Sequence, residues 1–317
     1  AAMAVGAIES KSFVPADIGR GIPGDAFEKH RIKRSNRFLD NENIEMLPVA
    51  SAIITLLASG DRQRYSETMK KVLGVALDWT AIGNFQVLTA AVVTTHRAMP
   101  FHFKVIDETE TRMKNAELEF LEELKDICPM WVHFRILADR GFDGVPFLTH
   151  VAAQGFSFVI RACKDNSIRQ DGEQVFTQLG DIPMERDRVY DFGEVEFTMA
   201  HRLKRRVVAV HDTGQKDAWF LVSNVLDCSG RSLVLQYGRR FEIEESFKDL
   251  KDMRAGLHLR QVTLEKPERL ARLLVAARLG RHVLRRAHHV RLARELADRH
   301  RGAEVGELAA TVGQQQH

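Results

Sequence analysis

The spacing of hydrophobic and polar residues changes several times along the chain, and each change predicts a different kind of element. Before about residue 70, apolar residues recur at helical intervals, as over Glu42–Ala58, which predicts a helical region. Short apolar runs follow at Val72–Leu77, Phe85–Val93 and Pro100–Ile106. Their length and their β-branched residues predict a three-stranded meander.

Helices and strands then alternate. The segment Glu110–Ile127 carries an apolar stripe that is typical of an amphipathic helix. A strand is predicted at Trp131–Ala138, a helix at Gly144–Gln154 and another strand at Phe156–Arg161. This order predicts an α/β fold in which helices pack on a mixed sheet.

The alternation stops at about residue 164, where short β segments separated by many turns predict a β-rich insertion. Helical periodicity returns over Tyr237–Met253 and Pro267–Asp298. We therefore predict five regions: a helical region 1–70, the first part of a core 71–163, a β-rich insertion 164–230, the second part of the core 231–265, and a basic helical region 266–317.

Composition excludes several classes of protein. The 317 residues are 44% apolar, which is enough for a packed core and about two domains. The three cysteines lie far apart and none has a partner at zinc-ligand spacing, which predicts free thiols in a reducing compartment, the cytoplasm. The longest apolar run, near Pro48–Ala58, is shorter than the ~20 residues that cross a bilayer, so no membrane is expected as a partner.

The net charge of +3 hides an uneven distribution. Five cations within Lys29–Arg37 predict either a solvated helix face or a helix that contacts phosphates through residues such as Lys33 and Arg34. Residues 266–302 hold eleven Lys and Arg against three acids. A basic amphipathic helix of this kind is compatible with nucleic acid, with packing on the core or with a membrane surface.

Acidic residues stand where apolar strands are predicted to end. Asp78 follows Val72–Leu77, and Asp139 follows Trp131–Ala138. Functional groups gather at such strand ends in α/β sheets, where the backbone is rigidly held. Turn and helix-cap aspartates give the same pattern, so either residue alone is weak evidence.

A third acid, Glu244, lies in a helix that is predicted to begin near Tyr237. In a continuous helix, one narrow stripe carries Glu244 together with basic and aromatic residues, and Lys248 borders it: Tyr237, Arg240, Glu244 and Lys251. A salt-bridged surface would give the same pattern, because Arg240 and Glu244 form an i,i+4 pair.

At these residues the sequence resembles the DDE transposases of bacterial insertion sequences. The spacing of four residues matches the YREK signature of one branch, the insertion-sequence-four type: Tyr237, Arg240, Glu244 and Lys251. The segments Ala76–Thr80 and Ala138–Phe142 resemble the stretches around the family's first and second catalytic aspartates. The three motifs follow the family's order, and the resemblance covers roughly residues 30–290.

This resemblance implies an RNase H-like mixed sheet that is flanked by helices and interrupted by a β-rich insertion. It implies that Asp78, Asp139 and Glu244 are catalytic and hold two Mg²⁺ or Mn²⁺ ions, with Asp78 bridging them. Together with the basic patterns, it gives a set of expected DNA contacts: Tyr237, Arg240, Lys248, Lys251, Arg140, Lys33 and Arg34.

The implied activity is cleavage at transposon ends and strand transfer into target DNA through a hairpin intermediate. The expected partners are double-stranded DNA with terminal inverted repeats, target DNA and a second copy of the chain, at the bacterial nucleoid. Two alternatives stay open: a DNA-end-binding remnant that has lost transposition, and a metal-dependent nuclease on the same core. Region 1–70, expected to bind DNA, is short for the family's end-recognising helices, which suggests a truncated region.

Overall fold

The computed structural model describes residues 2–66, 68–94, 97–107, 110–251, 262 and 264–276. These residues fall into two compact units, one formed by residues 2–38 with Ala276 and the other by Leu39–Val275. None of the helices in the described part of the chain combines the length and the apolar character needed to cross a membrane.

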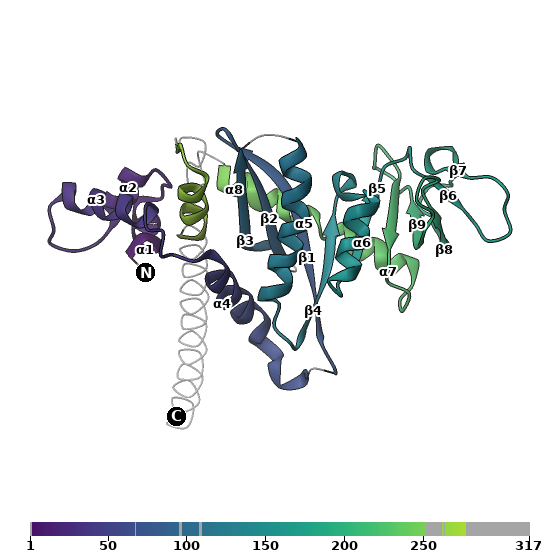
Figure 1. The fold of residues 1–317 in the computed structure, drawn as a ribbon, viewed down its shortest axis with the longest axis horizontal. Coiled ribbons are helices and arrows are strands. Elements are labelled where there is room, and N and C mark those ends of the chain that lie inside the picture. The colour runs from purple at the N-terminus through teal and green to yellow at the C-terminus, as the bar shows by residue number, and fades with distance from the viewer. Residues whose placement is uncertain are drawn as a thin grey trace, which may run out of the picture. The chain divides into compact units, whose positions relative to one another are not determined.

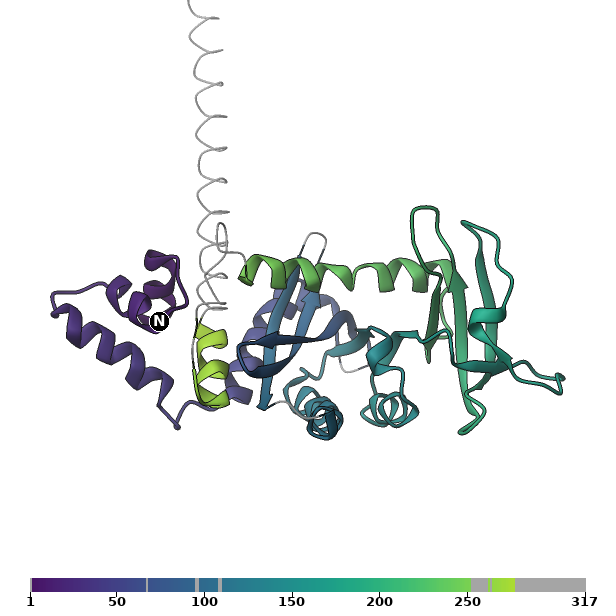
Figure 2. The same ribbon diagram turned by 90° about the horizontal axis from the view of Figure 1, so that it is seen from above.

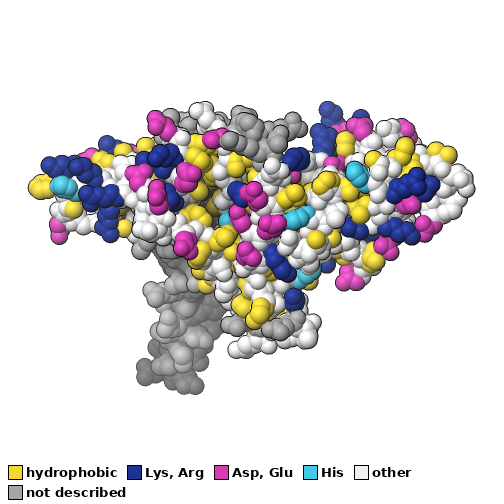
Figure 3. All heavy atoms as spheres, viewed as in Figure 1, with side chains coloured by type: hydrophobic (Ala, Val, Ile, Leu, Met, Phe, Trp, Pro, Cys, Tyr) yellow, Lys and Arg dark blue, Asp and Glu magenta, His cyan; other side chains and the backbone are white. Residues whose placement is uncertain are grey.

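The first unit contains three helices, α1 (Ala2–Ser10), α2 (Pro15–Gly21) and most of α3 (Glu28–Leu39). The backbones of α1 and α2 touch at two glycines, since a Cβ atom on Gly21 would lie 2.4 Å from the carbonyl oxygen of Gly6. The Ser35 hydroxyl fixes α3 by donating to the Pro15 carbonyl at 2.7 Å. Lys and Arg side chains gather over α3 (Figure 3), and both Lys33 and Arg34 are exposed.

The second unit is built on one sheet of ten described strands: β1 (Lys71–Ile82), β2 (Phe85–Val93), β3 (Ala98–Asp107), β4 (Val132–Ala138), β5 (Ser157–Ala162), β6 (Ser167–Arg169), β7 (Thr177–Gln178), β8 (Val189–Phe197), β9 (Leu203–Val210) and β10 (Trp219–Ser223). Their order across the sheet is β3-β2-β1-β4-β5-β10-β9-β8-β6-β7. The β1–β4 and β4–β5 pairs are parallel and the other pairs are antiparallel. The sheet is therefore mixed, as the sequence predicts.

Helices cover both faces of this sheet (Figures 1 and 2). One face packs against α4 (Met46–Ala58), α5 (Glu110–Ile127) and α6 (Val145–Ala153). The other lies under α7 (Gly230–Gly238) and α8 (Phe241–Lys251). Because successive strand residues point to opposite faces, a strand buried on both sides is apolar throughout. This arrangement confirms the α/β class with an RNase H-like mixed sheet flanked by helices.

Two elements have the predicted bounds, β2 and α5. The first strand differs, because it continues past Asp78 to Ile82 and forms a hairpin with β2 through the turn at Gly83, where φ is +59°. The predicted helix Tyr237–Met253 also differs, since α7 ends at Gly238 and α8 begins at Phe241.

Strands β6–β10 lie within the segment that is predicted to be a β-rich insertion. They continue the same sheet, because β10 pairs with β5 through Phe220↔Ala162 to Ser223↔Val159. Strand β8 runs through the whole of Val189–Phe197, with an irregularity between Asp191 and Gly193. Segment 164–230, which the sequence predicts as an insertion, therefore extends the core sheet and does not form a separate sheet.

Residues 267–276 are helical, and Leu270, Leu273 and Leu274 are buried. Two of the eleven cations of segment 266–302 have partners inside the second unit. Arg269 pairs with Asp40 at 2.9 Å, and the buried Arg272 donates to the Leu39 carbonyl at 2.7 Å. Residues from 277 onward, including most of the predicted basic helix, lie outside the described residues.

Candidate active site at the carboxylate cluster

Two neighbouring strands place Asp78 and Asp139 side by side. Ala76 is the last residue of β1 that pairs with β4, opposite Leu137, so each aspartate lies two residues past this pair. Leu77 and Ala138 pack in the core under α5 and α6. By alternation, Asp78 and Asp139 point to the opposite face, where α8 lies. Parallel pairing thus gives the two carboxylates the same height and the same face.

Helix α8 brings the third carboxylate to this face. Its first turn is tied to the end of β2, because the Glu242 carboxylate accepts a hydrogen bond from the Thr94 amide at 3.1 Å. The buried Ser246 donates to the carbonyl of Ala98 at the start of β3, at 2.8 Å. These two bonds fix α8 against the sheet on either side of Glu244. Asp78, Asp139 and Glu244 are called the carboxylate cluster below.

Arg240 lies inside the carboxylate cluster. It occupies the break between α7 and α8 and is only 5% exposed. One guanidinium nitrogen, Nη2, donates to Glu244 Oε1 at 2.5 Å, and Nη1 lies 3.9 Å from Asp78 Oδ1. The sequence predicts Arg240 as a DNA contact, whereas here its charge is directed to the acids.

The charges of Asp139 and Glu244 affect the pKa of Asp78. The pKa of Asp78 is raised from 3.8 to about 6, mainly by burial and to a smaller extent by the nearby Asp139 and Glu244 charges. The Arg240 charge opposes this rise. A buried carboxylate that is surrounded by like charges is destabilised unless a cation balances those charges. Carboxylates with pKa values raised in this way are common at functional sites.

A fourth acid lies behind the cluster, on the other face of the sheet. Glu117 of α5 is 3% exposed, and its carboxylate accepts a hydrogen bond from the Trp79 indole nitrogen at 3.0 Å. Burial raises the pKa of Glu117, while Trp79 and Lys114 lower it and the Asp139 charge raises it. Trp79 is half-buried and packs against the main core cluster.

Sequence reasoning missed Glu117, although a signal was present. The apolar stripe of α5 includes Met113, Ala116 and Phe120, and Glu117 lies within this stripe. A single acid inside an apolar helix face marks a buried carboxylate that needs a donor. Here the donor comes from the residue next to Asp78.

The loop after Asp139 is held rigidly. Asp139 caps the short 3₁₀ turn Arg140–Phe142 and accepts a hydrogen bond from the Gly141 amide at 2.9 Å. Lys114 donates to the Gly141 carbonyl at 2.9 Å. Asp143 accepts from the Cys163 amide at 2.7 Å, which joins this loop to the end of β5. Arg140, a predicted DNA contact, is exposed on this turn.

Tyr237 is fully buried, although the sequence analysis expects it to face DNA. Its ring packs edge-on against Trp219, with the ring centroids 5.0 Å apart, and against Phe241. Tyr237 and Glu244 would share a stripe only in a continuous helix. The helix breaks at Arg239–Arg240, and Tyr237 packs into the core under α7. Lys248 and Lys251 belong to α8, but their side chains lie outside the described residues.

The donor chemistry of the cluster fits a divalent metal ion. Carboxylate oxygens are the ligands that Mg²⁺ and Mn²⁺ prefer, and three of them come from three fixed elements. In the described part of the chain, however, no three Asp, Glu, His or Cys side chains are arranged closely enough to hold an ion. Arg240 supplies the compensating charge instead, so a metal would compete with it for Glu244.

Comparison with known families identifies the class of protein. Residues 75–279, more than half of the chain, match the transposase DDE domain family. The protein therefore belongs to this family, and it is a DDE transposase, an enzyme of the polynucleotidyl transferase and nuclease type. None of the curated proteins matches the sequence significantly.

Proposed function

We propose that this protein cleaves DNA at transposon ends and joins the freed ends to target DNA, with the carboxylate cluster as its catalytic centre. The observation that carries this proposal is the meeting of Asp78, Asp139 and Glu244 on one face of the sheet, beside a buried arginine. The YREK spacing of Tyr237, Arg240, Glu244 and Lys251 is the basis for proposing the insertion-sequence-four type branch of the family. DNA transposition is the activity that the family already implies.

The three carboxylates, Asp78, Asp139 and Glu244, would hold two divalent ions, Mg²⁺ or Mn²⁺. When bound, the ions would activate the attacking oxygen and stabilise the leaving oxygen of the scissile phosphate. The protein holds Asp78 and Asp139 on paired strands and Glu244 on a helix tied at both sides. Such rigid placement lowers the cost of assembling the site.

Each reaction of the proposed cycle replaces one oxygen on phosphorus by another. Water first cuts one strand, and the freed 3′-hydroxyl attacks the opposite strand to give a hairpin. Water then opens the hairpin, and the same 3′-hydroxyl attacks target DNA. One site suffices because every step needs only a nucleophile and a phosphodiester, positioned at the same carboxylate cluster.

The proposed DNA contacts divide between the two units. In the second unit, Arg140 stands exposed next to Asp139, and Lys248 and Lys251 are proposed to continue along α8. In the first unit, the exposed Lys33 and Arg34 of α3 would contact phosphates of the transposon end. Region 1–70 is thus the proposed end-binding region, and a second copy of the chain would hold the other end. The place of action would be the nucleoid.

A plasmid excision assay tests this proposal. The donor plasmid carries a marker between the inverted repeats that flank the coding region in its own genome, and the reaction contains Mg²⁺ and target plasmid. We expect excised hairpin-ended DNA, followed by joined product. Binding without cleavage, or cleavage without joining, would contradict the proposed transposition and would favour a remnant or a nuclease.

A further inference from the structure

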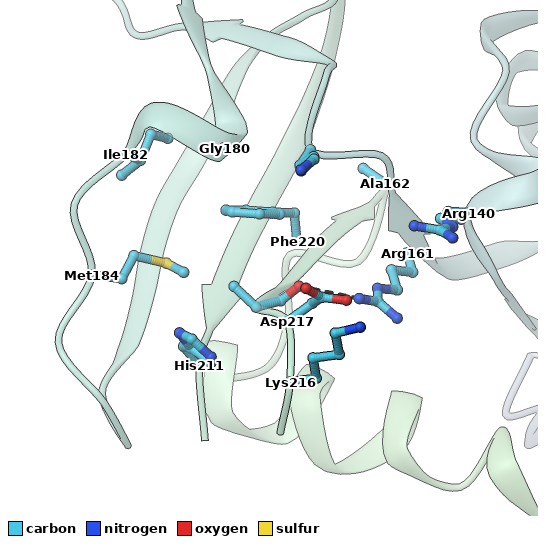
Figure 4. A pocket seen from close by; sticks show the side chains of 12 residues that line it. Arg140, Arg161, Ala162, Gly180, Ile182, Met184, His211, Lys216, Asp217 and Phe220 are labelled. Carbon is cyan, nitrogen blue, oxygen red and sulfur yellow. Dashed lines mark hydrogen bonds between the residues drawn. The ribbon is translucent and has the colours of Figure 1, made fainter. Parts of the chain in front are cut away.

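A cavity of about 330 Å³ lies between the end of β5, the loop before β10 and the 3₁₀ turn after Asp139. Four cations line it: Arg140, Arg161, Lys164 and Lys216. The loop acid Asp217 is the one carboxylate in its lining. Figure 4 shows Arg140, Arg161 and Lys216 on one side of the cavity, with Phe220 between them and the side formed by Ile182 and Met184.

These cations carry an excess of positive charge. Among the described residues, no ion pair within 4 Å neutralises any of the four. Arg161 is held in place by donating a hydrogen bond to the Ala218 carbonyl at 3.3 Å. Four cations against one carboxylate, with none of the four in an ion pair among the described residues, are suited to binding an anion.

The opposite side of the cavity is apolar. Phe220 is 5% exposed, and Ile182 and Met184 are half-buried. His211 also lines the cavity, and its buried Nε2 atom finds no hydrogen-bond partner within the described part of the chain. A free inorganic anion would leave this surface unused. A sugar-phosphate unit would use both sides, because its deoxyribose is largely apolar and its phosphate is charged.

Arg140 links the cavity to the carboxylate cluster. It lines the cavity and directly follows Asp139, whose backbone and side chain cap the same turn. A DNA strand with its scissile phosphate at Asp139 would therefore extend from the cluster into the cavity without leaving the protein surface.

We propose that this basic cavity binds the sugar-phosphate backbone of the DNA strand that flanks the cleavage position. Its contacts are with phosphates, so they position the strand and do not read its sequence. The identity of the ligand as DNA rests on the proposed function. The cavity is a second binding site, distinct from the residues that hold the reacting phosphate.

The salt dependence of DNA binding tests the cavity directly. Binding of a fluorescent duplex of arbitrary sequence is measured by anisotropy in EDTA at several salt concentrations, for the full chain and for the double variant Lys164→Gln/Lys216→Gln. Each lost phosphate contact lowers the slope of log K against log salt by about 1. We expect a loss of about 2 in the double variant, with unchanged thermal unfolding because both lysines are exposed.

The double variant Arg188→Gln/Lys204→Gln is the matched control. It removes two exposed cations that do not line the cavity, one directly before β8 and one in β9. An unchanged slope in the cavity variant, or an equal loss in the control, would overturn the proposal. The assay contains no metal and measures no cleavage. A negative result here would therefore not count against the proposed catalysis, and a failure of the excision assay would not count against DNA binding by the cavity.

Discussion

Replacing Asp78 by asparagine should stabilise the metal-free protein at neutral pH. Asparagine has nearly the same size and removes a charge that is 18% exposed and faces two other acids. Active sites often carry such unfavourable charges because function requires them. The variant should therefore lose activity and gain stability.

The pKa of Asp78 sets the size and the pH range of this effect. In the folded protein the pKa is raised from 3.8 to about 6, so the folded state binds the proton more tightly than the unfolded state. Below about pH 4 the side chain is neutral in both states and the variant gains nothing. Between about pH 4 and 6 the wild type progressively loses stability. Above this range the difference is constant at about 3 kcal/mol, since one pH unit corresponds to about 1.4 kcal/mol.

The assay is urea unfolding of both proteins in EDTA from pH 4 to 8. The difference in unfolding free energy should rise with pH and level off near pH 7, and Mg²⁺ should then stabilise only the wild type. Asp126→Asn, which removes an exposed charge on α5, is the control and should change stability by less than about 0.5 kcal/mol. A variant that is no more stable than the wild type at pH 7.5 would refute the reasoning.

Three further substitutions test the contacts around the site by urea unfolding at pH 7 in EDTA. Arg240→Gln removes the buried cation bonded to Glu244 and should lower the free energy of unfolding by about 3 kcal/mol. Mg²⁺ should restore part of this loss. No response to Mg²⁺ would contradict the role of Arg240 in balancing the charge of the acids. Trp79→Phe removes the indole donor of the buried Glu117 and should cost about 1–3 kcal/mol, whereas a neutral effect would mean that another group satisfies the acid. Arg206→Gln removes a buried guanidinium that pairs with the exposed Asp191 of β8 and donates to two carbonyls of the loop after β10. It should cost about 1.5–3 kcal/mol, and a cost below about 0.5 kcal/mol would show that these contacts are not stabilising.

Most of the fold could be predicted from the sequence because both faces of the sheet are covered. Strands buried on two sides are continuous apolar runs, and these runs mark β2 and β4 closely. The end of β1 could not be predicted, because the charge of Asp78 looked like a stop signal. Pairing with β2 continues past it, and pairing between strands is not visible in the local pattern.

The acids of the candidate site could be identified from the sequence, but the positions of the side chains around them could not. The resemblance to the transposases points to Asp78, Asp139 and Glu244, and the i,i+4 rule already relates Arg240 to Glu244. Burial of Tyr237 was not predictable, because it depends on a break in the helix at Arg239–Arg240. No proline marks this break in the sequence. Side-chain direction across such a break is decided by tertiary packing.

Metal-dependent cleavage by matched variants of α8 tests the central claim most directly. The substrate is an end-labelled duplex that carries the inverted repeat, incubated with Mg²⁺ or with EDTA. Glu244→Gln should abolish cleavage, while Glu245→Gln, the exposed neighbouring residue, should retain it. Asp78→Asn and Asp139→Asn should behave like Glu244→Gln. Cleavage by Glu244→Gln at the wild-type rate, or by the wild type in EDTA, would contradict a catalytic centre built from these three carboxylates.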